Sequence, residues 1–356
     1  MFTESLARPR FGSRLLRLLA GPHGVDRFTE LLDPMWTSET RATVVRTRRS
    51  GRNLTMWLQP NHPVAFEAGQ YVTLTVEIDG RRHSRCYSPA NAAPGGYRTR
   101  RPVAPLIELT VARHPGGVVS EYLHRSARSG MTVGLSAPAG DFVLPATRPR
   151  RLLLIAGGSG ITPVMSIVRT LSEQWFGGQI AVLHYVRTAE DACYRHQLAL
   201  LPDVRVRYGI TGEPGGDLDG HFNEQHLAAA MTDPDAVYVC GPPSLVAAVR
   251  RHYPAAVAET FAPAALVIPD SPGGGRITFS DSGIHTDDDG RTLLDQAETA
   301  GLTPKSGCRM GICHSCTRRK VRGVVRNLST GAVSTDDDDS VQVCVSVPVG
   351  DVDIAL

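Results

Sequence analysis

Four cysteines near the C-terminus constrain what this sequence can fold into more than any other feature. Three of them fall within the nine residues CRMGICHSC, and 27 residues then separate them from the fourth. The spacing C-x4-C-x2-C…C is the plant-type pattern for the ligands of a [2Fe–2S] cluster. Such a cluster needs a compact loop that directs thiolates at two irons, and the glycines in and beside this loop let the backbone approach the inorganic sulfides. The predicted metal ligands are Cys308, Cys313, Cys316 and Cys344.

A zinc site is the competing interpretation of these cysteines. Zinc sites usually pair two C-x2-C knuckles or add histidines at fixed spacing. This sequence has one C-x2-C and a neighbouring His314, which directly follows a predicted ligand and is expected to point outward. The seven cysteines are an odd number, and four belong to this constellation, so the disulfide framework of a secreted protein is disfavoured. We therefore expect a cytoplasmic protein in a reducing compartment.

The rest of the chain divides into segments with different periodicities. A length of 356 residues predicts two or three domains. Short β runs separated by turn residues over 39–148 favour an antiparallel β-barrel or sandwich, and alternating buried strands and helices over 149–268 favour a parallel α/β sheet. Proline and glycine mark a linker at 269–275, and the last segment, 276–356, begins with a predicted hairpin and a short helix.

The N-terminal segment 1–38 is arginine-rich and has a helical period, with Arg14 and Arg17 lying between leucines. We interpret it either as a helix that caps the body of the protein or as a helix that lies on an anionic membrane surface or a partner. No apolar run approaches the roughly 20 residues needed to span a bilayer. The formal net charge of +3 is too small to indicate a nucleic-acid partner.

Two motifs in the predicted barrel, RCYSPAN (85–91) and GGVVSEYL (116–123), resemble the flavin motifs of the ferredoxin–NADP reductase superfamily, and their chemistry suits that role. In RCYSPAN, Arg85 can pair with a pyrophosphate, Tyr87 can stack on the flavin ring, and Ser88 can bond to its reactive nitrogen. In GGVVSEYL, the start of a helix offers backbone and hydroxyl donors to a pyrophosphate. The residues that present these donors are Gly117, Val118, Val119 and Ser120.

A strand, a glycine turn and a helix follow one another in LLLIAGGSGITPVMSI, at the start of the predicted parallel sheet. The turn is not the G-x-G-x-x-G of a Rossmann domain, so alone it is weak evidence for a dinucleotide site. After the next strand, Arg187 and Arg195 stand where an NAD enzyme more often has an acidic residue. Basic residues favour the 2′-phosphate of NADPH, whereas Glu190 and Asp191 leave NADH as the alternative.

Taken in this order, the motifs resemble the ferredoxin–NADP reductase superfamily with a C-terminal plant-type ferredoxin domain. The resemblance covers about 40–356. It implies an antiparallel β-barrel domain for FAD, an α/β parallel-sheet domain for NADPH and an α+β β-grasp ferredoxin domain for the [2Fe–2S] cluster. The second flavin motif matches in full, which favours FAD, although one relative type with the same domain order uses FMN.

The resemblance also assigns roles around the nicotinamide. It matches GGSGITP and VCGPP to the family's nucleotide turns, which implies that Gly157, Gly158 and Thr162 approach the nucleotide and that Cys240 faces the hydride-bearing carbon. A buried cysteine at a strand end is the alternative interpretation of Cys240. With Tyr87 and Ser88, Cys240 makes up the predicted catalytic set. The segment ETFAPA resembles the one that closes this domain, which implies that Glu259 and Phe261 flank the flavin.

The implied activity is electron transfer from NADPH through FAD to the cluster, since a flavin can divide a two-electron hydride into single electrons. The cysteine loop and the N-terminal FTELLDPMW look like those of reductases that serve membrane di-iron fatty-acid (stearoyl-CoA) desaturases and hydroxylases. That acceptor would bring the protein to the inner face of the membrane through 1–38 and into lipid metabolism. The alternatives are a reductase for a soluble Rieske or haem oxygenase and, from another class, a redox-sensing or docking iron–sulfur protein with little turnover.

Overall fold

The computed structural model describes residues 40–79, 81–94, 106–260, 274–307, 309, 311 and 314–356. The predicted N-terminal helix at 1–38, Phe261 of the predicted flavin site, and two of the predicted ligands, Cys308 and Cys313, lie outside these residues. In the described part of the chain, no helix is both long enough and apolar enough to cross a membrane.

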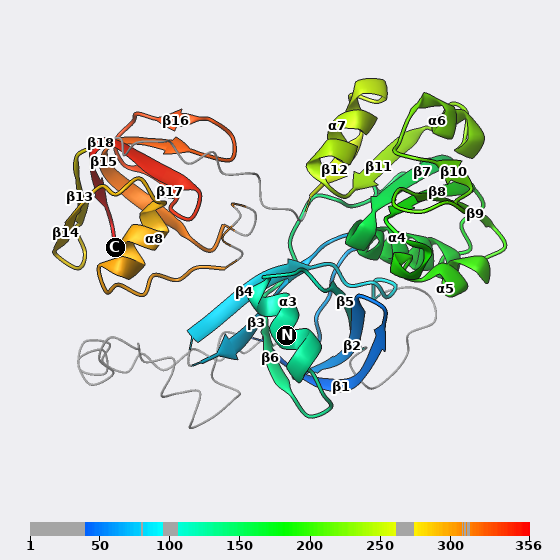
Figure 1. Ribbon diagram of the computed structural model, residues 1–356, viewed down its shortest axis with the longest axis horizontal. Coiled ribbons are helices and arrows are strands. Elements are labelled where there is room, and N and C mark those ends of the chain that lie inside the picture. The colour runs from blue at the N-terminus through cyan, green and yellow to red at the C-terminus, as the bar shows by residue number, and fades with distance from the viewer. Residues whose placement is uncertain are drawn as a thin grey trace, which may run out of the picture. The chain divides into compact units, whose positions relative to one another are not determined.

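The first sheet is antiparallel in every pairing for which the register is defined, and its strand order is β4-β3-β6-β1-β2-β5 (Figure 1). Alternate residues of the strands point inward and enclose a core of leucine and valine side chains, against which helix α3 also packs. This arrangement confirms the predicted antiparallel barrel architecture of the flavin domain. The elements are β1 (Thr40–Ser50), β2 (Asn53–Pro60), β3 (Val72–Ile78), β4 (Arg81–Tyr87), β5 (Ile107–Ala112), α3 (Val118–Ser126) and β6 (Thr132–Leu135).

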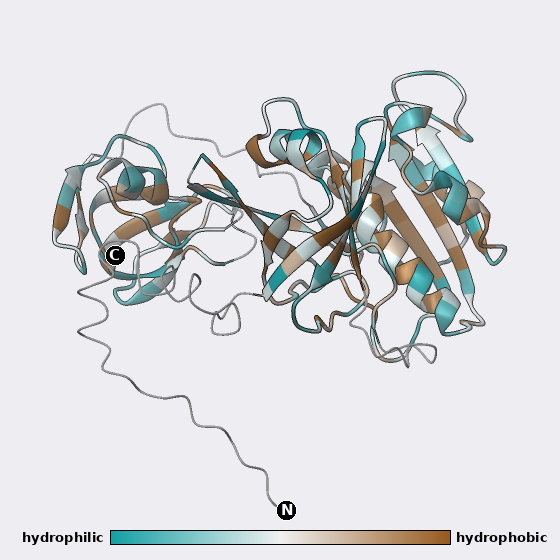
Figure 2. Cartoon of the chain, turned by 90° about the horizontal axis from the view of Figure 1, so that it is seen from below, coloured by the Kyte–Doolittle hydropathy of each residue, from teal (hydrophilic) through white to brown (hydrophobic). Residues whose placement is uncertain are grey.

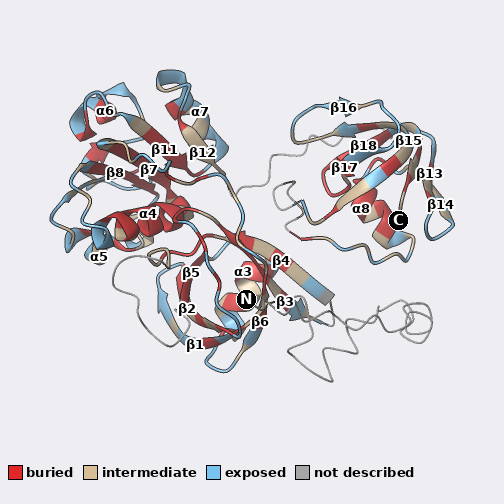
Figure 3. Ribbon diagram, turned by 180° about the vertical axis from the view of Figure 1, so that it is seen from behind, coloured by how far each residue is buried: buried red, intermediate tan, exposed pale blue. Residues whose placement is uncertain are grey.

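The second sheet is parallel and has the order β10-β9-β8-β7-β11-β12. Its inner strands are continuous apolar runs because helices cover both faces (Figures 2 and 3). The strands are β7 (Arg151–Gly157), β8 (Gln179–Val186), β9 (Val204–Ile210), β10 (Leu218–Asp219), β11 (Ala236–Cys240) and β12 (Val257–Glu259). The helices are α4 (Ile161–Glu173), α5 (Arg195–Ala199), α6 (Glu224–Ala230) and α7 (Pro243–His252), with short 3-10 turns η3 (Gly158–Gly160) and η4 (Ala189–Asp191).

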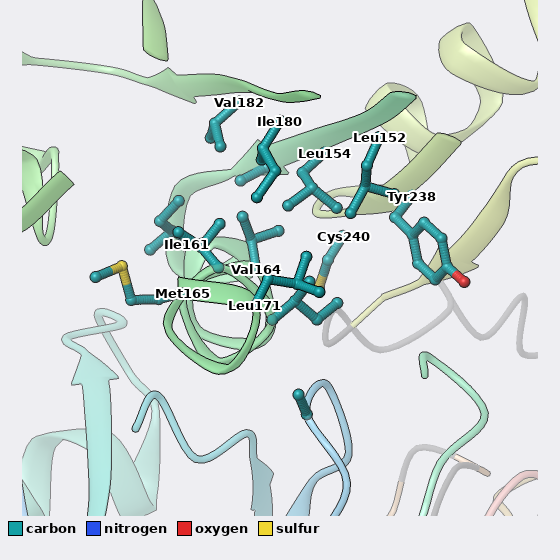
Figure 4. Close-up of a cluster of buried hydrophobic side chains, with 14 of the residues drawn as sticks. Leu152, Leu154, Ile161, Val164, Met165, Leu171, Ile180, Val182, Tyr238 and Cys240 are labelled. Atoms are coloured by element: carbon teal, nitrogen blue, oxygen red, sulfur yellow. The ribbon is translucent and has the colours of Figure 1, made fainter. Parts of the chain in front are cut away.

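The order of this sheet places its ligand crevice. From β7 the chain winds outward through β8, β9 and β10, and it then returns to the other side of β7 with β11. The sheet therefore has its switch point between β7 and β11, and open α/β sheets bind ligands beyond the carboxyl ends of the strands at such a point. The buried side of α4 closes the core below these strands, as Figure 4 shows for Val164 and Leu171.

Polar contacts join the antiparallel and parallel sheets. Arg169 on α4 pairs with the buried Glu108 of β5 at 3.2 Å, and the same carboxylate oxygen accepts the indole N–H of Trp57. The hydroxyl oxygens of Thr110 and Tyr194 lie 2.5 Å apart. Because Glu108, Thr110 and Tyr194 are buried, these contacts fix how β5 meets the parallel sheet.

The third sheet is mixed, with the order β14-β13-β18-β15-β16, and β17 pairs with β15. Its central pair β13–β18 is parallel and the other pairings are antiparallel, while α8 packs its leucines against one face. This is the predicted β-grasp arrangement of a ferredoxin domain. The elements are β13 (Arg276–Phe279), β14 (Ile284–Asp287), α8 (Leu293–Thr299), β15 (Thr317–Asn327), β16 (Val333–Ser334), β17 (Asp339–Gln342) and β18 (Ser346–Ile354).

Candidate redox site

Two of the four predicted cluster ligands are held together by the β15–β17 pairing. Cys316 directly precedes β15 and Cys344 follows β17, and the register pairs Thr317 with Gln342 next to them. The two Sγ atoms lie 3.1 Å apart, and both side chains are buried. This separation is far beyond the ~2.05 Å of a disulfide bond, and it suits two thiolates that bind one iron. The described half of the ligand set therefore fits the cluster.

The predicted flavin motif begins in the last three residues of β4 and continues beyond the strand. Arg85 donates from Nη1 to the carbonyl oxygen of Ser84 at 2.7 Å, and Tyr87 packs against the core of the antiparallel sheet. Burial raises the pKa of the Tyr87 hydroxyl above its ordinary value, so the phenol stays protonated. Ser88 is 1% exposed, and its Oγ has no hydrogen-bond partner within the described residues. Since buried hydroxyls are nearly always bonded, Ser88 fits the predicted hydrogen bond to a flavin.

The second predicted flavin motif forms the N-terminus of α3. Gly117 is the N-cap residue, and no side chain caps this end of the helix. A Cβ at Gly117 would lie 2.6 Å from Ser120 Oγ, so glycine is required for this close approach. The Ser120 hydroxyl bonds within the turn, to the carbonyl of Gly117 at 3.1 Å, while Val118 is exposed and Val119 is buried. The backbone N–H groups of the first turn are thus the donors that fit a pyrophosphate.

Glu259, which the ETFAPA resemblance predicts to lie beside the flavin, is half-buried, and its Oε2 is the second buried polar atom of this site. It ends β12, where the register pairs it with Cys240 of β11. Its Oε2 has no partner in the described part of the chain, and burial raises its pKa to about 8. Glu259 lines a pocket together with Tyr71, Gly140 and Phe142, which come from the antiparallel segment. A carboxyl group that is neutral near pH 7 and lines a pocket is typical of a functional site.

The predicted nucleotide turn connects β7 to α4. Gly158 has a φ of +54° and open space where a Cβ would lie. A Cβ on Gly160 would lie 2.1 Å from the carbonyl oxygen of Cys240, so this glycine lets the turn touch the end of β11. Thr162 is buried and donates from its hydroxyl to the carbonyl of Ser159 at 3.1 Å. The turn therefore sits at the switch point of the sheet, where a nucleotide is expected.

Cys240 ends β11 at the same switch point. Its side chain is fully buried in the apolar cluster that also contains Ile161 and Val164 (Figure 4). Burial, and then the nearby Glu259 carboxylate, raise the pKa of the thiol well above its usual range. Cys240 is therefore an inert thiol rather than a nucleophile. Its predicted approach to the nicotinamide stays a prediction.

A buried histidine supports the nucleotide turn, and the predicted site did not include it. His184 on β8 is fully buried, and its Nε2 lies 3.1 Å from the carbonyl oxygen of Gly158. Burial lowers the pKa of His184 to about 4 against the raising effect of this hydrogen bond, so the ring is neutral at physiological pH. Nε2–H is therefore the donor to the turn. The sequence signal was a single polar residue within the apolar strand QIAVLHYV.

Two arginines at the carboxyl edge of the parallel sheet are exposed, as the predicted 2′-phosphate site requires. Arg187 follows β8, and Arg195 begins α5 with its guanidinium 4.9 Å from the ring centre of Tyr208. Glu190, one of the two acidic residues that leave NADH as the alternative, is turned toward Gly51 of the β1–β2 turn: a Cβ there would lie 2.9 Å from Glu190 Cγ. The acidic side chain thus points toward the antiparallel sheet.

Comparison with known proteins finds a family model over each of the three sheets. Three family models match the chain: an oxidoreductase FAD-binding domain over residues 45–144, an oxidoreductase NAD-binding domain over 154–251, and a 2Fe-2S iron-sulfur cluster binding domain over 277–349. The protein is therefore an NAD(P)H-dependent oxidoreductase of the ferredoxin reductase type. The matches confirm the predicted cofactors: FAD, a [2Fe–2S] cluster and a nicotinamide dinucleotide.

The whole-chain matches define the family more narrowly. An NADPH oxidoreductase of Mycobacterium tuberculosis is 32% identical over 92% of this chain and 87% of its own length. A glycine betaine monooxygenase reductase subunit of Chromohalobacter salexigens is 27% identical over 80% of this chain and 85% of its own. The solved phthalate dioxygenase reductase aligns with a TM-score of 0.64 at 22% identity and covers 90% of this chain and 98% of its own. The chain belongs to the ferredoxin–NADP reductase superfamily, in the group that carries a C-terminal plant-type ferredoxin domain.

Proposed function

We propose that this protein is the reductase component of an oxygenase or desaturase system, to which it passes single electrons from NADPH. One observation carries the proposal: the buried Cys316–Cys344 thiol pair stands on the same chain as a flavin site and a nucleotide turn. Bound FAD would supply the conversion of a two-electron hydride into single electrons. The printed names of relatives, a glycine betaine monooxygenase reductase subunit and a stachydrine N-demethylase reductase subunit, support an oxygenase-type acceptor.

Different residues of this protein would bind the flavin, the nucleotide and the cluster. Ser88 offers an unbonded buried hydroxyl to the flavin ring, and the aromatic face of Tyr87 is available for stacking. The turn at Gly157 and Gly158 would receive the nucleotide, while the buried Cys240 thiol would help to exclude water from the transfer. The four cysteines 308, 313, 316 and 344 would hold the cluster, which takes electrons one at a time.

We propose NADPH rather than NADH as the electron donor, because Arg187 and Arg195 of the predicted 2′-phosphate site are exposed and Glu190, one of the two acidic residues nearby, points toward Gly51. Replacing both Arg187 and Arg195 with alanine should lower kcat/KM for NADPH at least tenfold and leave the value for NADH nearly unchanged, since the charge pairs with the 2′-phosphate are lost. Arg207→Ala, an exposed arginine on β9, is the matched control. Equal losses for both nucleotides would refute the assignment.

The proposed acceptor is a membrane di-iron fatty-acid desaturase or hydroxylase, and a soluble Rieske or haem oxygenase is the second candidate. The first is motivated by the resemblance of the cysteine loop and of 1–38, and the second by the oxygenase reductases among the relatives. The purified protein is combined with each acceptor, and NADPH consumption is measured together with product. Product formed only with a soluble oxygenase would reject the desaturase.

Membrane contact through 1–38 has its own test. Flotation of the full-length protein with anionic liposomes should fall when residues 1–38 are deleted. NADPH-dependent reduction of ferricyanide is the control that the remaining chain is folded. Unchanged flotation would reject membrane binding through 1–38 but leave the proposed electron transfer untouched. If the full-length protein did not rapidly reduce ferricyanide or cytochrome c, a redox-sensing role would be favoured instead.

A further inference from the structure

The cluster loop between α8 and β15 contains residues with a left-handed backbone conformation, which is unfavourable where the residue is not glycine. Gly311 has a φ of +74° and His314 a φ of +55°, both in the left-handed region. Glycine adopts this region freely, but a residue with a Cβ pays of order 1 kcal/mol or more. At His314 contacts offset this cost, among them the hydrogen bond that its carbonyl oxygen accepts from the N–H of Thr317 at 3.0 Å.

One side chain makes further contacts with this part of the loop. Gln342 is the last residue of β17 and stands two positions before Cys344. Its Nε2 lies 2.8 Å from the carbonyl oxygen of Gly311 and 3.0 Å from Nδ1 of His314. An amide nitrogen has two hydrogens and can only donate, so both hydrogens are used on the loop. The Nδ1 of His314 must accept, and the ring proton is on Nε2, at the exposed side of the loop.

We propose that Gln342 is a positioning residue for the cluster loop, and that His314 serves as the acceptor of this bridge rather than as a metal ligand. The bridge joins the strand that leads to Cys344 with the segment that lies between Cys308 and Cys316 along the chain. It therefore orders the loop for its four thiolates, as partners outside the ligand set do in metal sites. The inference rests on the cluster assignment made above.

The test measures how fast the cluster is lost from the full-length holoprotein, in the wild type and in variants of Gln342. In Gln342→Met, which keeps the length of the side chain but cannot donate, the visible absorbance of the oxidised cluster should decay about tenfold faster under a chelator. The EPR signal of the reduced cluster should also change. Flavin reduction by NADPH should proceed as in the wild type.

A second glutamine in the same domain is the matched control. Gln296 on α8 is buried and donates two hydrogen bonds of 2.8 Å, to Asp288 and to the carbonyl of Arg291, away from the cluster loop. Gln296→Met loses two donated hydrogen bonds, as Gln342→Met does, and also the one that Gln296 Oε1 accepts from Asp289 N at 3.0 Å. It should lower thermal stability without the change in EPR signal. If Gln296→Met alters cluster decay and EPR signal as strongly as Gln342→Met, the proposal is overturned, because general destabilisation then explains both.

Variants at 314 test the role of the histidine. Asn tolerates the left-handed region and places its Oδ1 near the position of Nδ1, so His314→Asn should keep the cluster nearly as long as the wild type. His314→Ala, which has no acceptor, should lose it faster, and adding this change to Gln342→Met should have little further effect. Equal decay for His314→Asn and His314→Ala would refute the bridge. A purified wild type that holds zinc and shows no [2Fe–2S] spectrum would refute the cluster assignment itself.

Discussion

The sulfur atoms of Cys316 and Cys344 lie 3.1 Å apart although 27 residues separate them along the chain. The hairpin-like pairing of β15 with β17 brings them together, because each cysteine stands just outside one of the paired strands. Their environment is apolar, with Val343 and Val345 fully buried on either side of Cys344. The pair is thus part of the domain core, so the folding of this domain and the cluster site depend on each other.

Replacing Cys344 with serine tests this relationship directly. The variant should lose the visible and EPR spectra of the cluster, since a hydroxyl is a much poorer iron ligand than a thiolate. NADPH should still reduce the flavin at the wild-type rate, because the flavin motif and nucleotide turn belong to the other two sheets. The measurement is stopped-flow absorbance under anaerobic conditions. A cluster that survives the substitution would contradict the assignment of Cys344 as a ligand.

Glu259 should make the stability of the protein depend on pH. Burial raises its folded pKa from 4.5 to about 8, so between these values the folded state keeps a proton that the unfolded state has released. The contribution of Glu259 to the free energy of unfolding is therefore fully present below pH 4.5 and is lost as the pH rises from there through 8. The loss is at most about 1.4 kcal/mol per pH unit.

The measurement is thermal unfolding of the wild type and Glu259→Gln from pH 5 to 8. Because glutamine does not titrate, the variant should gain stability relative to the wild type as the pH rises. Two parallel curves would show that Glu259 has an ordinary pKa. Glu77, on β3, has an exposed side chain, so Glu77→Gln controls for loss of a carboxylate.

His184 should determine nucleotide binding more than catalysis. Removing its Nε2–H leaves the carbonyl of Gly158 without this donor, and a lost buried hydrogen bond costs about 1–3 kcal/mol. His184→Leu should therefore raise KM for NADPH about tenfold while kcat changes little. His184→Gln, which can place an amide N–H near the position of Nε2, should restore most of the affinity. Equal losses in both variants, or a loss confined to kcat, would contradict a role in holding the turn.

The sequence predicted the antiparallel sheet, the parallel sheet and the ligand spacing because these depend on local patterns, whereas the β-grasp sheet was predicted from the family resemblance. The unbroken apolar run of β7 and the C-x4-C-x2-C loop are visible without knowing what lies nearby. His184 and Gln342 are missing from the predicted site for the opposite reason. Each acts through a partner more than 15 positions away, and neither the Gly158 carbonyl nor the Gly311 carbonyl is marked in the sequence. Contacts of that kind follow from packing rather than from periodicity.

Gly160 is the most sharply constrained position of the nucleotide turn. Its hypothetical Cβ would lie 2.1 Å from the carbonyl oxygen of Cys240, and the clash is with backbone that cannot rotate away. Gly160→Ala should displace the turn from β11 and lower both the affinity for NADPH and the rate of flavin reduction, since small displacements at a reacting centre are costly. Gly177→Ala, where no atom lies within 4 Å of the new methyl group, should leave both unchanged. Stopped-flow reduction over a range of NADPH concentrations separates affinity from rate. A Gly160→Ala variant that behaves like Gly177→Ala would mean that the end of β11 and the turn do not approach one another in the working enzyme.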